Sequence, residues 1–135
     1  MPKETPSSDS QRDAPSAFKS RGGLQRVLNA MSYSLAGLSA AFRHEAAFRQ
    51  ELALGLPLVL LAPWLAPGRW QLLAMVASVV LVWVVELLNS AVEALADAVS
   101  ADRHPLLGRA KDLGSAAVML CLLQVVVVWA VVLWP

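Results

Sequence analysis

The residues of this sequence that are best suited to chemistry are carboxylate and amide side chains inside a long apolar stretch. Glu86 directly follows residues 70–85, which are almost entirely apolar. A carboxylate in the core of a bilayer costs about 3 kcal/mol on insertion scales, so such a residue normally serves a function. Asn89, Glu93 and Asp97 follow at about −60°, −20° and +20° around the helix axis, relative to Glu86. These side chains therefore share one narrow stripe, which is about 16 Å long.

A second polar face opens the last apolar stretch. Lys111 and Ser115 stand one helical turn apart there, and Asp112 lies on the same side. The link over residues 100–108 is short, so the helices on its two sides are expected to be antiparallel neighbours. This second face would then lie beside the carboxyl-terminal end of the acidic stripe.

The two faces together have a chemical interpretation. Several carboxylates at a membrane surface suit a divalent cation such as Mg²⁺, which prefers oxygen ligands and usually bridges phosphate groups. Lys111 would neutralise a polyphosphate. The low dielectric around Glu86 disfavours its charged form, which suits a general base acting on an alcohol. The pattern predicts a site where a water-soluble nucleotide meets the hydroxyl group of a lipid.

Two other interpretations of the stripe stay open. Polar residues also join transmembrane helices, so Glu86 and Asn89 are candidates for an interhelical clamp in a structural partner subunit. Intramembrane carboxylates also relay protons or bind cations, which is typical of a small ion or solute transport subunit. Measurements of ATP consumption and of ion flux discriminate these classes.

The composition indicates a membrane protein. Of the 135 residues, 57% are hydrophobic and 16% are charged, whereas soluble domains are roughly half apolar and a quarter charged. The net charge of +1 excludes a polyanion binder that relies on bulk charge, and the single cysteine excludes an intrachain disulfide. The sequence contains neither a G-x-x-x-x-G-K-[ST] loop nor the protein-kinase motifs, so any phosphoryl transfer requires another architecture.

The predicted fold is all-α. Residues 1–22 are rich in Pro, Ser and charge, which predicts a disordered cytoplasmic tail, and residues 23–135 are predicted to form one membrane domain. Apolar residues recur at steps of three and four over residues 24–50, which favours an amphipathic helix in the membrane interface. The alternative is a cytoplasmic helix packed on a partner. The predicted membrane spans are about 51–67, 70–99 and 110–134.

The basic residues predict the orientation in the membrane. Arginine and lysine precede the first span and flank the second link, whereas Arg69 alone lies in the first link. The positive-inside rule then places the amino terminus and the second link in the cytoplasm and the carboxyl terminus outside.

Several motifs resemble those of the prokaryotic diacylglycerol kinase family. They are E-L-L-N-S-A-V-E-A at 86–94, G-R-A-K-D-L-G-S-A-A-V at 108–118, S-Y-S-L-A-G-L at 32–38 and H-E-A-A-F-R-Q-E at 44–51. The resemblance covers roughly residues 24–134. It implies a homotrimer in the bacterial inner membrane, with active sites shared between protomers and a periplasmic carboxyl terminus. The implied activity, part of phospholipid metabolism, is the Mg-ATP-dependent phosphorylation of diacylglycerol to phosphatidate. A related branch of the family phosphorylates undecaprenol instead, and that alternative stays open.

The resemblance also implies a role for each matching residue. Glu86 would be the general base, Asn89 would position the reacting groups, and Glu45 and Glu93 would hold the metal ion. The implied ATP-binding residues are Arg26, Tyr33, Glu45, Glu93, Asp102, Arg103, His104, Lys111 and Asp112. The implied lipid-binding residues are Met31, Ser34, Leu35, Ala47, Phe48, Arg49, Glu51, Glu86 and Ser115. The sequence departs from the family pattern at Leu35, where a tryptophan is common, and at His44, where an asparagine is common.

Overall fold

The computed structural model describes residues 23–99 and 104–134, and all regular secondary structure within them is α-helical. The helices are α1 (Gly23–His44), α2 (Ala46–Leu65), α3 (Arg69–Val99) and α4 (Pro105–Leu133). The all-α prediction is therefore confirmed. The predicted tail over residues 1–22 and the predicted nucleotide-binding residues Asp102 and Arg103 lie outside the described residues.

The boundary between the first two helices differs from the prediction of one helix over residues 24–50. The helix breaks at Glu45, whose backbone is extended with φ −100° and ψ 110°. Residues 46–50 therefore belong to α2, which is 20 residues long. The physical reason is length, because a helix needs about 20 residues to cross a bilayer and residues 51–67 are too few. α2 continues as one helix through Pro57 and Pro63.

The last helix begins earlier than the predicted residue 110. Pro105 occupies the first turn of α4, where its missing N–H leaves no hydrogen bond unmade. The imidazole Nδ1 atom of His104 accepts a hydrogen bond of 3.3 Å from the backbone N–H of Leu106. This side-chain cap satisfies one of the free N–H groups of the first turn.

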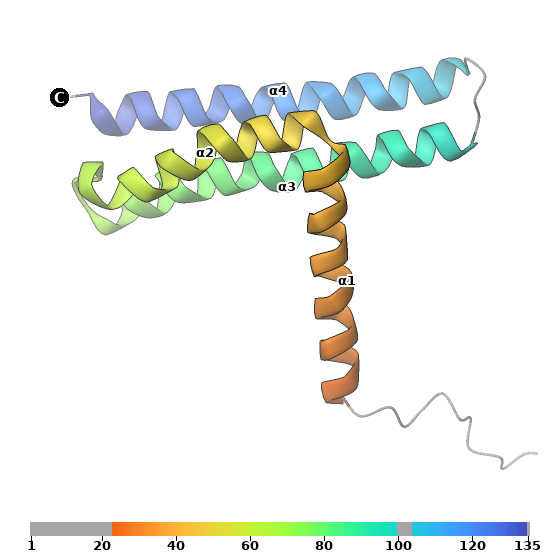
Figure 1. Cartoon of the computed structure of the whole chain (residues 1–135). Helices are drawn as coiled ribbons and strands as arrows, with labels where there is room; N and C mark the ends of the chain where they lie inside the picture. Colours follow the sequence, from red (N-terminus) through yellow and green to blue (C-terminus); the bar gives the residue numbers. More distant parts are fainter. Residues whose placement is uncertain (1–22, 100–103, 135) are drawn as a thin grey trace, which may run out of the picture. The chain divides into compact units, whose positions relative to one another are not determined.

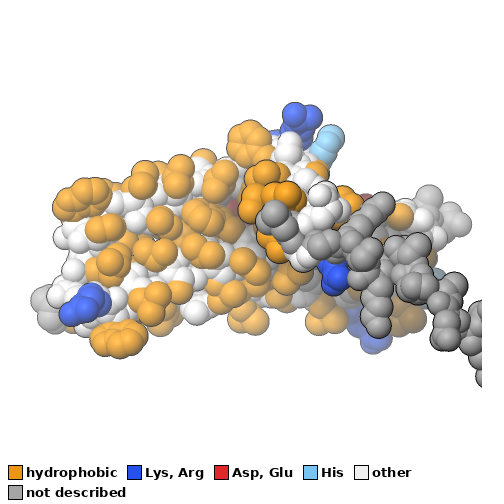
Figure 2. All heavy atoms as spheres, turned by 90° about the horizontal axis from the view of Figure 1, so that it is seen from below, with side chains coloured by type: hydrophobic (Ala, Val, Ile, Leu, Met, Phe, Trp, Pro, Cys, Tyr) orange, Lys and Arg blue, Asp and Glu red, His pale blue; other side chains and the backbone are white. Residues whose placement is uncertain are grey.

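Three of the described helices, α2, α3 and α4, are long and apolar enough to cross a membrane. Hydrophobic side chains cover most of the face of the molecule that Figure 2 shows. α3 has 31 residues, so it extends about 46 Å. The hydrocarbon core of a bilayer is only about 30 Å thick, so one or both ends of α3 lie beyond it.

The described chain forms two units that divide between Ala36 and Gly37. The larger unit contains α2, α3 and α4 together with the last part of α1. Within it α3 packs against both α2 and α4, and successive helices run in opposite directions (Figure 1). The carboxyl end of α4 therefore lies at the same end of the bundle as the turn between α2 and α3. This arrangement confirms the predicted antiparallel pairing of the last two helices.

A small apolar core joins the three long helices. Ala62 and Met75 are fully buried and cluster with Val79 and Trp129. The indole N–H of Trp129 donates a hydrogen bond of 3.4 Å to the backbone carbonyl of Met75, which ties α4 to α3. The indole N–H of Trp83 donates a hydrogen bond of 3.2 Å to the carbonyl of Glu51, which ties α3 to α2.

Close approach of α2 and α3 requires a glycine at position 55. A Cβ atom built there would lie 2.7 Å from Val79 Cγ1 and 2.9 Å from Trp83 Cζ2. We expect Gly55→Ala to lower the free energy of unfolding by about 1–3 kcal/mol, the usual cost of overpacking a well-packed site. Unfolding by sodium dodecyl sulfate in mixed micelles measures the change.

The matched control for this prediction is Gly108→Ala in α4. No atom lies within 4 Å of a Cβ atom built at Gly108, so this variant gains helix propensity without a clash. Equal stability of the two variants would contradict the predicted close approach.

Candidate active site

The acidic stripe of α3 runs from the interior of the bundle to its surface. Glu86 and Asn89 are buried, with 4% and 9% of their surface exposed. Glu93 is half-buried, and Asp97 is exposed. Solvent exposure therefore increases along the predicted stripe, from the buried carboxylate of Glu86 at one end to the exposed carboxylate of Asp97 at the other.

Further carboxylates gather around Glu86 from other elements. Glu93, about two helical turns further along α3, and Glu45, between α1 and α2, both lie within electrostatic range of the Glu86 carboxylate. Glu51 on α2 also interacts electrostatically with Glu86. Like charges this close repel one another, so the cluster favours a bound cation or bound protons. The extended backbone at Glu45 separates two helices at the point where the chain adds its carboxylate to this cluster.

Asn89 connects the stripe to α4. Its Nδ2 atom donates a hydrogen bond of 3.0 Å to Glu93 Oε1. Its Oδ1 atom is buried and has no hydrogen-bond partner among the described residues. This oxygen occupies the space that a side chain at Gly114 would fill, because a Cβ atom built at Gly114 collides with it.

A lysine from α4 meets the outer end of the stripe. Lys111 Nζ lies 2.6 Å from Asp97 Oδ1, and both side chains are substantially exposed. The contact agrees with the predicted pairing of this end of α4 with the end of α3, although an exposed ion pair contributes little stability. Asp112 and Ser115, on the same helix, are exposed.

Two residues that the resemblance assigns to substrate binding, Arg49 and His104, make hydrogen bonds that stabilise helix ends. The Arg49 guanidinium donates hydrogen bonds of 3.1 and 3.2 Å to the backbone carbonyls of Phe42 and Arg43, at the carboxyl end of α1. It therefore holds the turn that carries Glu45. His104 caps α4, as described above.

Several of the remaining ligand residues of the prediction belong to the part of α1 that precedes Gly37. The smaller unit contains Arg26, Met31, Tyr33, Ser34 and Leu35. The roles implied for these five residues stay predictions. Ala47 is exposed on the first turn of α2.

An apolar groove of about 590 Å³ lies between α2, α3 and the carboxyl-terminal part of α1. Phe48, which the resemblance assigns to the lipid, is buried in its wall. The other lining residues are Leu38, Ser39, Phe42, Leu52, Val80, Trp83, Val84 and Leu87. Sequence reasoning missed the four that α3 contributes. Trp83, Val84 and Leu87 lie three, four and seven residues after Val80, so the four share a second face of α3. Because most residues of α3 are apolar, the sequence does not distinguish this face from the rest of the helix.

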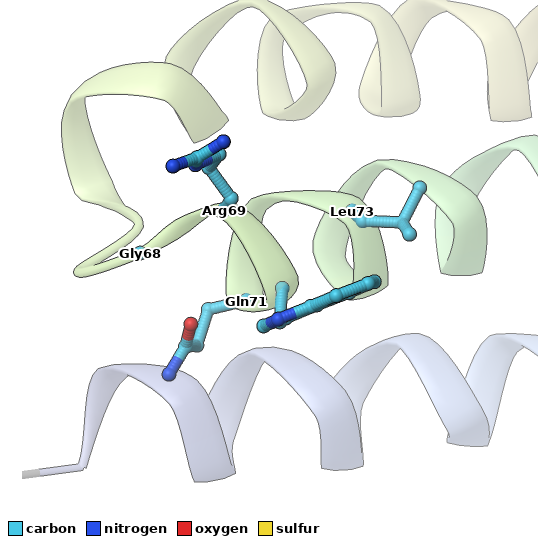
Figure 3. A pocket seen from close by; sticks show the side chains of 5 residues that line it. Gly68, Arg69, Gln71 and Leu73 are labelled. Carbon is cyan, nitrogen blue, oxygen red and sulfur yellow. The ribbon is translucent and has the colours of Figure 1, made fainter.

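A second hollow, of about 630 Å³, lies at the start of α3 and is lined by Gly68, Arg69, Trp70, Gln71 and Leu73. Figure 3 shows that Arg69 and Gln71 extend from opposite sides of the first turn of α3. This hollow lies at the opposite end of α3 from Asp97 and contains none of the acidic residues. The side chains of Arg69 and Gln71 do not converge on one point, so they are not arranged to act together on one ligand.

The carboxylate cluster has the donor atoms that Mg²⁺ prefers, because it offers carboxylate oxygens, and Asn89 adds an amide oxygen that has no partner among the described residues. Within residues 23–99 and 104–134, no group of three His, Cys, Asp or Glu side chains converges to form a complete metal site. One or two carboxylates are sufficient for Mg²⁺ when substrate phosphates supply further oxygens. Glu45 and Glu93 are residues of this kind.

The arrangement defines a class of protein. Three helices have membrane length, α3 carries the buried Glu86 and Asn89, and the lining of the apolar groove includes Leu87, the residue after Glu86. The chain is therefore a small multi-pass membrane protein with an acidic site and an adjoining apolar surface.

Comparison with known proteins identifies the family. The family model described as prokaryotic diacylglycerol kinase matches residues 32–133. A diacylglycerol kinase from Pseudomonas aeruginosa is 51% identical over 120 residues, which cover 89% of this chain and 98% of the relative. Diacylglycerol kinases from Escherichia coli and Haemophilus influenzae are 45% identical over 112 residues, which cover 83% of this chain and 92% and 95% of theirs. This chain belongs to the prokaryotic diacylglycerol kinase family, which confirms the resemblance drawn from its motifs.

Proposed function

We propose that this protein transfers the γ-phosphate of ATP to the free hydroxyl of diacylglycerol and so produces phosphatidate, in phospholipid metabolism. Its relatives carry the name of this activity. The observation that carries the proposal is the burial of Glu86 among other carboxylates on a membrane-length helix. Neither packing nor solubility accounts for a carboxylate there, because an isolated buried charge costs several kcal/mol.

Glu86 acts as the general base in this proposal. Its carboxylate takes the proton of the lipid hydroxyl while the hydroxyl oxygen attacks the γ-phosphorus, and ADP leaves in line with the attack. Asn89 helps to position the reacting groups. Most of the rate enhancement comes from positioning and from charge stabilisation, so no covalent phosphoenzyme is required.

Glu45 and Glu93 are the proposed ligands of Mg²⁺, which when bound would neutralise the phosphate charge of ATP. The like-charged cluster and its oxygen donors support this choice. Lys111 and Asp112 are the proposed contacts to the nucleotide from α4, with His104, Arg26 and Tyr33. Lys111 contacts Asp97, so it would exchange that carboxylate for a phosphate oxygen when ATP binds.

The apolar groove between α2, α3 and the end of α1 is proposed to receive an acyl chain. Its lining is almost wholly hydrophobic, and its volume is typical of a site for a small ligand. Leu87 in its wall is next to Glu86 in the sequence, so a chain in the groove would bring its glycerol hydroxyl toward the base. Glu51 and Ser115 remain proposed contacts to the lipid.

The membrane arrangement is proposed as follows. The amino terminus and the α3–α4 link face the cytoplasm of the bacterial inner membrane, and the carboxyl terminus faces the periplasm. α1 lies in the cytoplasmic interface with its apolar residues toward the lipid. α4 exposes large apolar side chains along its length, including Leu113, Leu120 and Val126. These surfaces support contact with lipid and with further copies, and a homotrimer with shared active sites is the proposed assembly.

A coupled assay of ATP consumption with purified protein in mixed micelles tests the proposed activity. We expect turnover with diacylglycerol and little with undecaprenol. Higher turnover with undecaprenol would assign the chain to the other lipid substrate. Ion flux in liposomes without ATP consumption would instead support a transport subunit and overturn the proposal.

We expect Glu86→Gln to reduce turnover by about 10²–10⁴-fold, the usual contribution of a general base. Glutamine has the same shape but cannot accept the proton, so nucleotide binding should be retained. The measurements are the turnover number in mixed micelles and nucleotide binding by equilibrium dialysis. Circular dichroism provides the control for folding. Near-normal turnover of a folded Glu86→Gln protein would remove Glu86 from the role of base.

We expect Val84→Trp to raise the KM for diacylglycerol several-fold, because the larger side chain would fill part of the apolar groove. The KM for ATP should stay unchanged, since the groove lies apart from Lys111. The matched control is Leu123→Trp on α4, at a position that is 55% exposed and outside the groove. An unchanged KM for the lipid in Val84→Trp would show that the acyl chain lies elsewhere.

A further inference from the structure

We propose that Gly114 is a positioning residue for the active site. Because it has no side chain, it lets the Asn89 amide pack directly against α4, and this packing orients Asn89 Nδ2 toward Glu93. The inference rests on the proposed function in one respect, the role of Glu93 as a metal ligand.

The three atoms nearest to a Cβ atom built at Gly114 all belong to Asn89. A Cβ atom built at Gly114 collides with Asn89 Oδ1 and lies 3.3 Å from Asn89 Cγ and 3.8 Å from Asn89 Cα. The last of these atoms belongs to the backbone of α3. The amide cannot move away easily, because Asn89 is only 9% exposed. An alanine at position 114 would therefore displace the amide or separate the two helices.

The two ends of the Asn89 amide have different surroundings, and this difference makes the orientation of the amide chemically important. Nδ2 donates to Glu93 Oε1 at 3.0 Å. A reversed amide would place two acceptor oxygens against each other, so the contact with Glu93 fixes which end points toward the carboxylate. Oδ1 is left at the surface of Gly114 without a partner among the described residues. The fold thus leaves one buried acceptor unpaired while it holds the donor on Glu93.

The other glycines of the larger unit set Gly114 apart. Gly55 is as crowded, but its neighbours are the side chains of Val79 and Trp83 rather than a polar group of the stripe. Gly108, on the same helix, has no atom within 4 Å of its built Cβ. Close packing alone explains Gly55. The contact of Gly114 with an amide that binds a carboxylate of the site points to a role in orienting that carboxylate.

The kinetic test uses Gly114→Ala with Gly108→Ala as the matched control. Loss of a residue that orients a metal ligand typically weakens metal affinity by about 10–100-fold. We expect Gly114→Ala to raise the KM for Mg²⁺ by a factor in this range and to leave the KM for diacylglycerol unchanged. A KM for Mg²⁺ within twofold of that of Gly108→Ala would overturn the proposal.

A double-mutant cycle with Asn89→Ala separates positioning from general packing. Once the amide is removed, an alanine at position 114 has nothing to displace, so Gly114→Ala should change the KM for Mg²⁺ by less than twofold in that background. An equal rise in both backgrounds would overturn the proposal. If Gly114→Ala alone does not fold, Asn89→Ala provides the comparison, because it removes the same donor from Glu93 and must raise the KM for Mg²⁺ similarly.

A spectroscopic test is independent of kinase activity. The chain contains two asparagines, Asn29 and Asn89, so selective ¹⁵N labelling of asparagine gives two side-chain amide signals. We expect the Asn89 protons to exchange slowly with water in the wild type and in Gly108→Ala, and at least tenfold faster in Gly114→Ala. Unchanged exchange in Gly114→Ala would overturn the positioning role. Absence of kinase activity in the wild type would overturn only the proposed function, since this measurement still decides the geometry.

Discussion

The electrostatic cost of holding carboxylates together inside a helical bundle governs this structure. Glu45, Glu51 and Glu93 come from three parts of the chain, and each lies within electrostatic range of the buried Glu86. Such an arrangement persists only when the surrounding contacts are strong enough to maintain it. The Trp83 and Trp129 indoles hydrogen-bond to the backbone of neighbouring helices, and the close contacts at Gly55 and Gly114 let those helices approach. The apolar part of the bundle thus holds together a group of charges that would otherwise separate.

The sequence predicted the acidic stripe and the pairing of α3 with α4 because both depend on local rules. Helical periodicity alone brings Glu86, Asn89 and Glu93 to one side. A short link leaves neighbouring helices few options other than antiparallel packing. The contact of Lys111 with Asp97 follows from these two constraints. The membrane character of the chain was equally accessible, since it depends on composition and on the length of the apolar runs.

Other features depended on contacts between elements and were not accessible from the sequence. Residues 43–51 have helical periodicity without interruption, so the break at Glu45 was not visible and the first span was predicted to begin too late. The groove beside the stripe was missed because Trp83 and Val84 are apolar residues in an apolar helix. The contact between Gly114 and Asn89 was not predictable, because the two residues lie on different helices. Glu45 and Glu51 were already among the predicted site residues, but their approach to Glu86 depends on the packing of α2 against α3.

The length of α3 has a consequence for how the two substrates meet. A helix that is longer than the hydrocarbon layer continues from the bilayer core into the aqueous phase without a break in its backbone. Glu86 and Asp97 are therefore fixed points on one rigid rod, with the first in a dry environment and the second in a wet one. In the proposed reaction, a nucleotide dissolved in water and a lipid alcohol dissolved in the bilayer can each approach this helix from its own phase. Neither molecule has to cross the boundary between water and lipid before the reaction. The protein therefore does not need the conformational changes by which a transporter moves a polar solute across a membrane.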